Sequence, residues 1–377
     1  MNTFPPEPSR RAFLSSIPEQ SSQFLDTPPD ARFLYVPRTH ARALSFDTML
    51  VQGIRGSGKS LWWGALQRRE HREVISSILG AGAVDVDADV AAGFGKPLSP
   101  HAYPGQDTLK RLIASYDARD IWWSVVFSHV LDERTREAAP PFATSTDFSW
   151  EARVAWLVEH PESRERIVYD RDQEFLRTGH RKLVLFDALD LTSSDFRLRN
   201  VFLRGLLQVL LELRSCRAIR AKAFVRPDML ASADVTSFPD ASKIVTNDVR
   251  LTWPRIDLYN LLWQHLANAP EGGEVVRSSF KELSPPGFSE RDDIWHAPLS
   301  LSREDVQQEI FHALAGPYLG RDRRRGLSYT WLPNHLADAQ EQVSPRSFLA
   351  ALRKAAESQL GQEGYALSYQ SIKEGVQ

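Results

Sequence analysis

The chain has 377 residues, of which 42% are hydrophobic and 25% charged, and its formal net charge is −2. This composition is typical of a globular protein, and the length suffices for about two domains with a sizeable core. The near balance of charges and a pI near 6.6 argue against broad binding to a phosphate backbone, so only a local basic patch leaves nucleic-acid binding open.

Cys216 is the only cysteine, so an intramolecular disulfide and a cysteine-rich metal site are both excluded. The most apolar runs, IWWSVVFSHVL and VFLRGLLQVLLEL, are too short or carry a charge, whereas a membrane span needs ~18–20 uninterrupted apolar residues. The N-terminus has prolines and charges where a signal peptide has an apolar region. We therefore expect a cytoplasmic protein without a membrane span, in which Cys216 is a small buried hydrophobic residue.

Residues 1–46 are proline-rich at the start and weakly patterned, which indicates an N-terminal arm. The apolar run at 48–52 predicts a buried strand, and the spacing of apolar residues from Gly58 to about Leu79 predicts a helix. The stretch GAGAVDVDADVAAGFGKPLSPHAYPG then breaks the pattern with glycine and proline, as a loop does.

Between this strand and helix lies GIRGSGKS, which matches the Walker A pattern G-x-x-x-x-G-K-[ST]. Glycines allow positive φ, so that successive N–H groups can face one anion at the N-terminus of a helix. Lys59 can reach the β- and γ-phosphates of a nucleotide, and the Ser60 hydroxyl can ligate Mg²⁺. A glycine-rich turn that merely precedes a helix is the alternative. The motif predicts nucleotide contacts at Gly53, Arg55, Gly56, Ser57, Gly58, Lys59, Ser60 and Leu61.

From Thr108 to about Gly179 the apolar residues recur at helical spacing. The run KLVLFDALD that follows is short, apolar and ends in acid, as a fully buried parallel strand does. FRLRNVFLRGLLQVLLELRS predicts the next helix, and IRAKAFVRPDML and KIVTNDVRLTW predict two further strands, each followed by helix-like sequence. Strands that alternate with helices indicate an α/β fold, in which helices flank both faces of a parallel sheet.

The acidic end of KLVLFDALD matches the Walker B element of P-loop proteins. Asp187 ends the predicted strand, where it can hold Mg²⁺, and Asp190 can orient or deprotonate the attacking water. An acidic turn that caps the next helix is the alternative for both residues. The separation between Lys59 and Asp187 exceeds what a minimal P-loop core needs, which predicts a helical insertion. Neither N-K-x-D nor L-S-G-G-Q occurs, which disfavours a GTPase and a transporter-type ATPase.

Four segments, GIRGSGKS, LVLFDALD, AKAFVRPDML and SPRSFLAALRKA, resemble the bacterial P-loop ATPases related to the KAP group, in the STAND branch close to AAA+. The resemblance spans roughly residues 47–360 and includes the D-x-L-D form of the second motif. It implies that Arg226 is a sensor of the γ-phosphate and that Arg346 contacts the nucleotide from a lid domain. Guanidinium groups suit both roles, because they pair with phosphate oxygens in a planar fork. A structural ion pair and a surface residue are the respective alternatives.

The patterns along the chain give its expected organisation, and the resemblance supplies the names ATPase core and lid. We expect an N-terminal arm at 1–46, a P-loop ATPase core at 47–270 with a helical insertion at about 80–180, and a C-terminal helical lid domain at 271–377. KAP proteins commonly carry membrane spans inside the core, whereas this chain has helices without a span there.

Two weaker features leave their roles open. The arginines of GRDRRRG, residues 320–326, suit a solvated loop, an arginine finger or a nucleic-acid contact. Trp62 and Trp63 can approach a nucleotide base, but tryptophans on a helix beside a sheet usually lie in the core.

The resemblance implies a cytoplasmic ATPase of the STAND and KAP-like class. Such a protein uses ATP binding and slow, Mg²⁺-dependent hydrolysis as a switch that is coupled to a protein partner or effector, with bacterial anti-phage defence as the suggested setting. A P-loop phosphotransferase and a non-hydrolysing ATP-binding scaffold are the alternatives. The sequence leaves open whether the chain forms a homo-oligomer.

Overall fold

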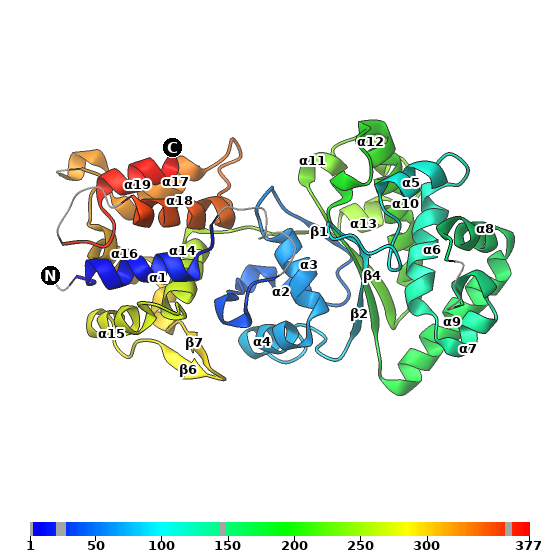
Figure 1. Cartoon of the computed structure of the whole chain (residues 1–377), viewed down its shortest axis with the longest axis horizontal. Coiled ribbons are helices and arrows are strands. Elements are labelled where there is room, and N and C mark those ends of the chain that lie inside the picture. Colours follow the sequence, from blue (N-terminus) through cyan, green and yellow to red (C-terminus); the bar gives the residue numbers. More distant parts are fainter. Residues whose placement is uncertain (1–2, 20–27, 144–147, 321, 359–363) are drawn as a thin grey trace. The chain divides into compact units, whose positions relative to one another are not determined.

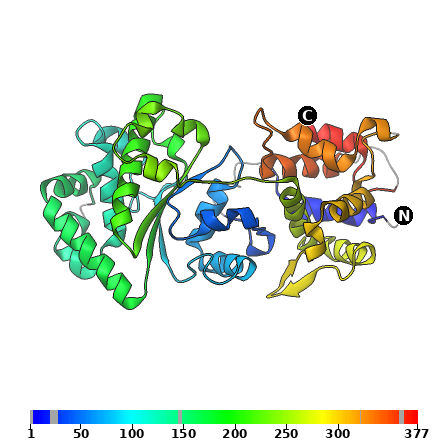
Figure 2. The same ribbon diagram turned by 180° about the vertical axis from the view of Figure 1, so that it is seen from behind.

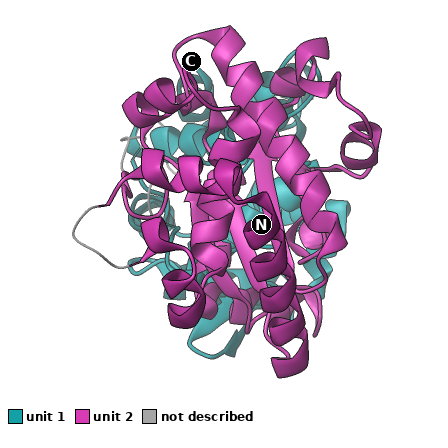
Figure 3. Ribbon diagram, turned by 90° about the vertical axis from the view of Figure 1, so that its right-hand side faces the viewer, with its two compact units in different colours: residues 1–37, 55–58, 252–377 teal, residues 38–54, 59–251 magenta. Residues whose placement is uncertain are grey.

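The computed structural model describes residues 3–19, 28–143, 148–320, 322–358 and 364–377. The chain divides into two compact units, which Figure 3 colours separately. Unit 1 contains Met1–Pro37, Arg55–Gly58 and Thr252–Gln377, and unit 2 contains Arg38–Ile54 and Lys59–Leu251. Each unit has its own hydrophobic core.

Unit 2 is built around a five-stranded sheet in the order β2-β3-β4-β1-β5, in which every neighbouring pair is parallel. The strands are β1 (Leu50–Gln52), β2 (Asp89–Phe94), β3 (Lys182–Phe186), β4 (Ile219–Val225) and β5 (Val249–Arg250). The inner strand β3 is buried along its whole length, because KLVLF supplies the apolar run that a strand covered on both faces requires.

Helices cover both faces of this sheet (Figure 1). On one face α3 packs against β2 and β4, and on the other α6 contacts β2 and β3 while α10 contacts β4. The predicted α/β fold with a helix-flanked parallel sheet is therefore confirmed. The helices of unit 2 are η3 (Arg38–His40), α2 (Ala41–Leu44), α3 (Lys59–Gln67), α4 (Arg69–Leu79), α5 (Gln106–Leu112), α6 (Ala118–Val130), α7 (Glu133–Glu137), η4 (Pro140–Phe142), α8 (Trp150–Glu159), α9 (Pro161–Thr178), η5 (Leu189–Leu191), α10 (Phe196–Glu212), η6 (Leu213–Ser215), α11 (Pro227–Leu230), α12 (Ala233–Thr236) and α13 (Ser242–Val245).

The two most apolar runs of the sequence form α6 and α10, which pack against each other and against the sheet. Trp122 on α6 is fully buried, its ring meets Phe186 of β3 and Phe202 of α10 edge-on, and its N–H donates to the Phe202 carbonyl at 2.8 Å. Within the described ranges, none of the helices combines the length and the apolar character that crossing a bilayer requires.

Strand β2 is absent from the sequence prediction, which assigns its residues to a loop. DVAAGF is only partly buried and holds two alanines and a glycine, so it lacks the apolar run that marks β3. Gly93 is nevertheless required, because a Cβ there would overlap the side chains of Val184 and Phe186 on the neighbouring strand. The close approach of β2 to β3 thus uses small residues, and the region expected as an insertion from about residue 80 contributes a strand to the sheet.

The single helix predicted from Gly58 to about Leu79 is wrong in one respect, because the structure has two helices that meet at Arg68. Arg68 is extended, with φ −104° and ψ 126°. The guanidinium of Arg72 donates to the carbonyl of Leu66 at 2.7 Å, so it satisfies a carbonyl that a continuing helix would have paired.

Trp62, Trp63 and Cys216 are core residues, as the sequence suggests. Trp62 is fully buried and Trp63 is 8% exposed, and their indole groups donate to His40 and to the carbonyl of Leu185. Burial raises the pKa of the Cys216 thiol to about 11, so it is not a reactive thiolate at neutral pH.

Unit 1 is a helical body with one two-stranded antiparallel hairpin. Helix α1 packs against α14, α15 and α18 (Figure 2), and Phe4 and Phe13 are fully buried there. The region predicted as an arm, 1–46, is therefore divided: its described residues up to Pro37 belong to unit 1, where α1 joins the core, and residues 38–46 belong to unit 2. The elements of unit 1 are α1 (Pro6–Ser16), η2 (Ala31–Phe33), α14 (Arg255–Ala267), α15 (Gly273–Leu283), β6 (Ser289–Arg291), β7 (Ile294–His296), η7 (Leu299–Ser302), α16 (Glu304–Ala315), η8 (Arg323–Arg325), α17 (Ser328–Leu336), α18 (Pro345–Glu357) and α19 (Tyr369–Val376).

A buried lysine anchors the segment that leads to β1. Lys222 on β4 is fully buried, and its ammonium donates to the carbonyls of Ala43 at 2.5 Å and Ser45 at 2.8 Å. Burial lowers the pKa of Lys222 from 10.5 to about 7, because a charged ammonium is costly away from water. A neutral amine can still donate both hydrogen bonds.

This pKa predicts a pH-dependent stability. Between pH 7 and 10.5 the unfolded state binds more protons at Lys222 than the folded state, so the free energy of unfolding should rise with pH across this window. The slope from one such group is at most about 1.4 kcal/mol per pH unit. Lys222→Met should lack this contribution, and chemical denaturation of both proteins from pH 6 to about pH 10 measures the difference. If the free energies of unfolding of the two proteins change with pH in the same way, the pKa of Lys222 is not lowered in the folded state.

Candidate functional site

The glycine-rich loop, Gly53–Ser60, connects β1 to α3. Strand β1 ends at Gln52, the N–H of Gly53 donates to the carbonyl of Val225 at 3.1 Å, and α3 begins at Lys59. The order of strand, loop and helix is therefore the one that the sequence predicts. Leu61 follows in the first turn of α3.

Two glycines give this loop its shape. Gly56 has φ 80° and Gly58 has φ 99°, values that residues with a Cβ rarely adopt. A Cβ on Gly56 would also overlap the Ser344 hydroxyl. Within the described residues, the backbone N–H groups of Gly56 and Gly58 donate no hydrogen bond. Both amides therefore remain available to an anion.

Lys59 folds back on the start of the loop. Its ammonium donates to the carbonyl of Gly53 at 2.7 Å and to that of Ile54 at 2.9 Å. Burial is the largest cause that lowers the pKa of Lys59, and Asp187 partly opposes it. The lysine is thus held against the loop by hydrogen bonds to neutral carbonyls, and these bonds are what an anion would replace.

Ser60 and Asp187 form a buried hydrogen-bonded pair. The hydroxyl of Ser60 donates to the Asp187 carboxylate at 2.6 Å, and Asp187, which follows β3, is 4% exposed. Burial raises the pKa of Asp187, whereas the Ser60 hydrogen bond acts in the opposite direction. A hydroxyl and a carboxylate side by side are hard oxygen donors of the kind that Mg²⁺ prefers, so the residues fit the predicted cation.

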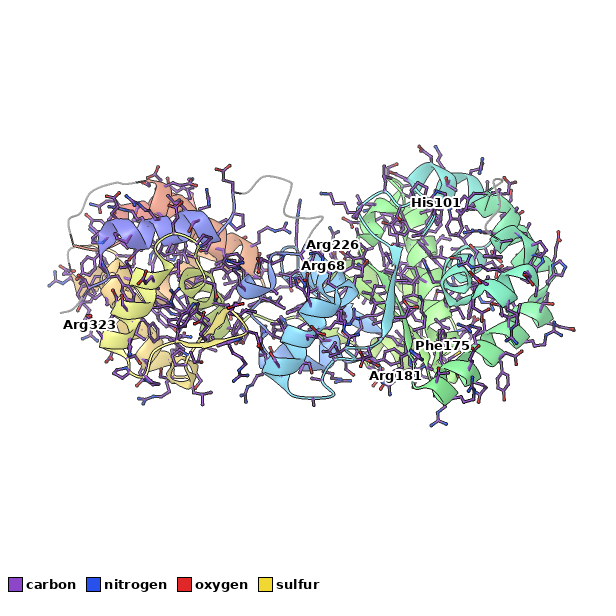
Figure 4. The ribbon with its side chains drawn as sticks, turned by 60° about the horizontal axis from the view of Figure 1, so that its bottom comes forward. Arg68, His101, Phe175, Arg181, Arg226 and Arg323 are labelled. Atoms are coloured by element: carbon purple, nitrogen blue, oxygen red, sulfur yellow. The ribbon has the colours of Figure 1, made fainter. Side chains whose placement is uncertain are left out.

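Arg226, which is labelled in Figure 4, has two carboxylates close to its guanidinium. It follows β4, its guanidinium binds Asp228 at 3.1 and 2.7 Å, and one nitrogen lies 3.7 Å from the Asp190 carboxylate. Hydrogen bonding to Asp228 is the main cause that raises the pKa of Arg226. All three residues influence the pKa of Lys59, so they belong to the same charged cluster.

The middle of the loop, Arg55–Gly58, belongs to unit 1, as does Arg346. A Cβ on Gly56 would lie 3.4 Å from the Cβ of Arg346, which occupies the first turn of α18 after the N-cap residue Ser344. Partial burial and the nearby charge of Arg55 lower the pKa of Arg346. Two like charges beside the loop make this part of unit 1 favourable for an anion.

Ser57 is a buried residue of the loop. It is 1% exposed, and its hydroxyl has no hydrogen-bond partner among the described residues. The indole N–H of Trp253 donates to its carbonyl at 2.8 Å. An unpaired buried hydroxyl is unusual, and a bound phosphate would supply the missing acceptor.

The structure groups the predicted site residues in two sets. In unit 2 it brings together Lys59, Ser60, Asp187, Asp190 and Arg226, and in unit 1 it places Arg346 beside the loop residues 55–58. Sequence reasoning missed Asp228, Trp253 and Ser344. Asp228 lies in AKAFVRPDML, Trp253 ends LTW and Ser344 begins SPRSFLAALRKA, but the resemblance assigned none of these three residues a role.

Three other observations complete the description of the site. No protein-family model, curated protein or solved structure matches the chain.

In the part of the chain that the structure describes, no group of three or more histidine, cysteine, aspartate or glutamate residues could hold a metal ion. In the arginine-rich loop, η8 (Arg323–Arg325) begins at Arg323, which is labelled in Figure 4, and Asp322 caps it by accepting from the Arg324 N–H at 2.9 Å.

The buried hydrogen bond between Ser60 and Asp187 should contribute to the stability of the protein. Ser60→Ala removes a donor from a buried carboxylate and should lower the free energy of unfolding by about 1–3 kcal/mol. Ser77→Ala, on the exposed side of α4, is the matched control and should change it by less than about 0.5 kcal/mol. Chemical denaturation at neutral pH measures both. Equal stability of the two variants would mean that the Ser60 hydroxyl contributes nothing to the fold.

Proposed function

We propose that this protein is an ATPase of the P-loop class, which binds ATP with Mg²⁺ at the glycine-rich loop and hydrolyses it. The observation that carries the proposal is the Ser60–Asp187 pair beside Lys59, at the end of a loop in which the Gly56 and Gly58 amides donate no hydrogen bond within the described residues. These groups supply what a nucleoside triphosphate needs: amides and an ammonium for the phosphates, and oxygen ligands for the cation.

Each group has a distinct role in this proposal. Lys59 and the loop amides bind the β- and γ-phosphates, and the unpaired Ser57 hydroxyl offers a further donor. Ser60 and Asp187 would hold Mg²⁺, which neutralises charge on the phosphate oxygens when it is bound.

Asp190 is the proposed group that orients and deprotonates the attacking water. Its side chain is 41% exposed, so water reaches it, and its ion pair with Arg226 places a guanidinium beside it. Arg226 would pair with the γ-phosphate and thereby distinguish ATP from ADP. The planar guanidinium of Arg226 binds Asp228 through two nitrogens, and it can donate to two phosphate oxygens in the same way.

The resemblance to KAP and STAND proteins extends the proposal from hydrolysis to switching. Arg346 would contact the nucleotide from the C-terminal helical part, and its position beside Arg55–Gly58 in unit 1 supports this role. ATP binding and slow hydrolysis would then control a protein partner or effector. Anti-phage defence in bacteria is the setting that the resemblance suggests.

The first test of this proposal concerns binding. Lys59→Ala should lose a charge-assisted contact worth about 1.5–3 kcal/mol, which weakens ATP binding roughly ten- to hundredfold. Lys243→Ala, which removes an exposed lysine of the same unit, is the control. Isothermal titration calorimetry with Mg²⁺ and ATP measures the dissociation constants. An unchanged affinity in Lys59→Ala would overturn the assignment of the loop.

The second test separates chemistry from binding. Asp190→Asn should keep ATP bound but slow its hydrolysis by about two orders of magnitude or more, which is the usual contribution of a positioned general base. Asp234→Asn, on the exposed surface of α12, should leave turnover unchanged. Phosphate release measured with water alone and with added acceptors also distinguishes an ATPase from a phosphotransferase. If Asp190→Asn turns over like the parent, another group is the base.

A further inference from the structure

The carbonyl groups of the glycine-rich loop have partners of their own. Because a trans peptide is planar, the C=O of one residue and the N–H of the next point in opposite directions. A side chain that binds a loop carbonyl from outside therefore aims the following N–H inward. At the start of the loop, the carbonyls of Gly53 and Ile54 both accept from the Lys59 ammonium.

At the other end of the loop the partner is Trp253. Its indole N–H donates to the carbonyl of Ser57, a residue 196 positions away in the sequence, at 2.8 Å. The next N–H in the chain belongs to Gly58, and within the described residues it donates no hydrogen bond. The carbonyl that Trp253 holds thus shares its peptide plane with one of the amides that the loop offers to an anion.

Trp253 itself is well supported inside unit 1. Its half-buried ring packs against the hydrophobic core of the unit and lies 6.4 Å from the ring of Tyr35, centroid to centroid. The Tyr35 hydroxyl donates to Asp257 at 2.5 Å and accepts from Asn260 at 3.3 Å, and both partners lie on α14. Helix α14 begins at Arg255, two residues after Trp253, so the helix that binds the Tyr35 hydroxyl is also the one that Trp253 leads into.

We propose that Trp253 is a positioning residue for the glycine-rich loop, which orients the Ser57–Gly58 peptide so that the Gly58 amide faces the polyphosphate of the substrate. This inference rests on the proposed function for its ligand, but the orientation of the peptide is a property of the ligand-free protein. Trp253 touches no phosphate in this scheme, and its effect passes through a single hydrogen bond.

The decisive variant is Trp253→Phe, which keeps an aromatic ring beside Tyr35 and removes the indole N–H. Trp331→Phe is the matched control, because Trp331 is also half-buried in unit 1 and its ring stacks on His335 at 3.8 Å. Loss of one neutral hydrogen bond changes an equilibrium by about two- to tenfold. We therefore expect effects of this size at the loop in the first variant and none in the second.

The first measurement needs no ligand. Trypsin cleaves after the exposed Arg55 only when the loop opens locally, so the rate of this cut reports the stability of the loop. Fragment masses identify the cut, and cleavage at Arg324 in η8 serves as the internal reference. Trp253→Phe should raise the rate at Arg55 about two- to tenfold without changing the rate at Arg324.

The second measurement is binding of inorganic tripolyphosphate and of ATP with Mg²⁺. Trp253→Phe should weaken both by about two- to tenfold while the turnover of bound ATP stays within about twofold, because the variant disturbs an amide that binds and leaves Asp190 in place. A change in turnover without a change in affinity would contradict the inference.

The outcomes separate this inference from the proposed function. If Trp253→Phe and Trp331→Phe give equal cleavage rates at Arg55, Trp253 does not position the loop and the inference is wrong. If cleavage at Arg55 accelerates in Trp253→Phe but the parent protein binds neither tripolyphosphate nor ATP, the positioning role stands and the ATPase proposal fails.

Discussion

The buried carboxylate of Asp187 imposes a geometric condition on this site, because it needs a hydrogen-bond donor where water is excluded. The Ser60 hydroxyl meets that need, and since Ser60 lies in the first turn of α3, the bond ties the start of this helix to the end of β3. Parallel strands present their carboxyl ends at one edge of a sheet. The same bond therefore brings Lys59 to the edge where Arg226 follows β4.

The glycine-rich loop meets a second condition, which concerns its carbonyl groups. A loop that offers amides to an anion must place the opposite carbonyls against other partners, or bury them unpaired at a cost of about 1–3 kcal/mol each. Lys59 and Trp253 are those partners, one from each end of the loop. The shape of the proposed phosphate site thus depends on Trp253, which would not touch phosphate, as well as on Lys59, which would. Arg55–Gly58 and Arg346 lie in the same unit. A ligand that binds both would stabilise the conformation of unit 1 in which the loop and Arg346 are close together.

Local patterns in the sequence predicted the strands β1, β3 and β4, as well as α10, because these elements are marked by apolar runs and periodicity. They missed β2, whose small residues are dictated by the side chains of Val184 and Phe186 on the next strand. They also missed the end of α3, which depends on a side chain in α4 that binds a backbone carbonyl. The same limit applies to the site. Lys59, Ser60 and Asp187 belong to motifs, whereas the roles of Asp228 and Trp253 arise only from contacts in the folded chain.

The charges around Lys59 bear on why the proposed reaction would need a divalent cation. The groups that most influence the pKa of Lys59 include three carboxylates, those of Asp187, Asp190 and Asp228, and one further cation, Arg226. A bare polyphosphate would meet this cluster with like charges, and the interaction would be strongest at the least solvated carboxylate, Asp187. Burial already disfavours the charged form of Asp187. A cation bound there would stabilise the charged carboxylate, and its positive charge would make the cluster attractive to an anion. The cluster is therefore better matched to a nucleotide with its cation than to the nucleotide alone.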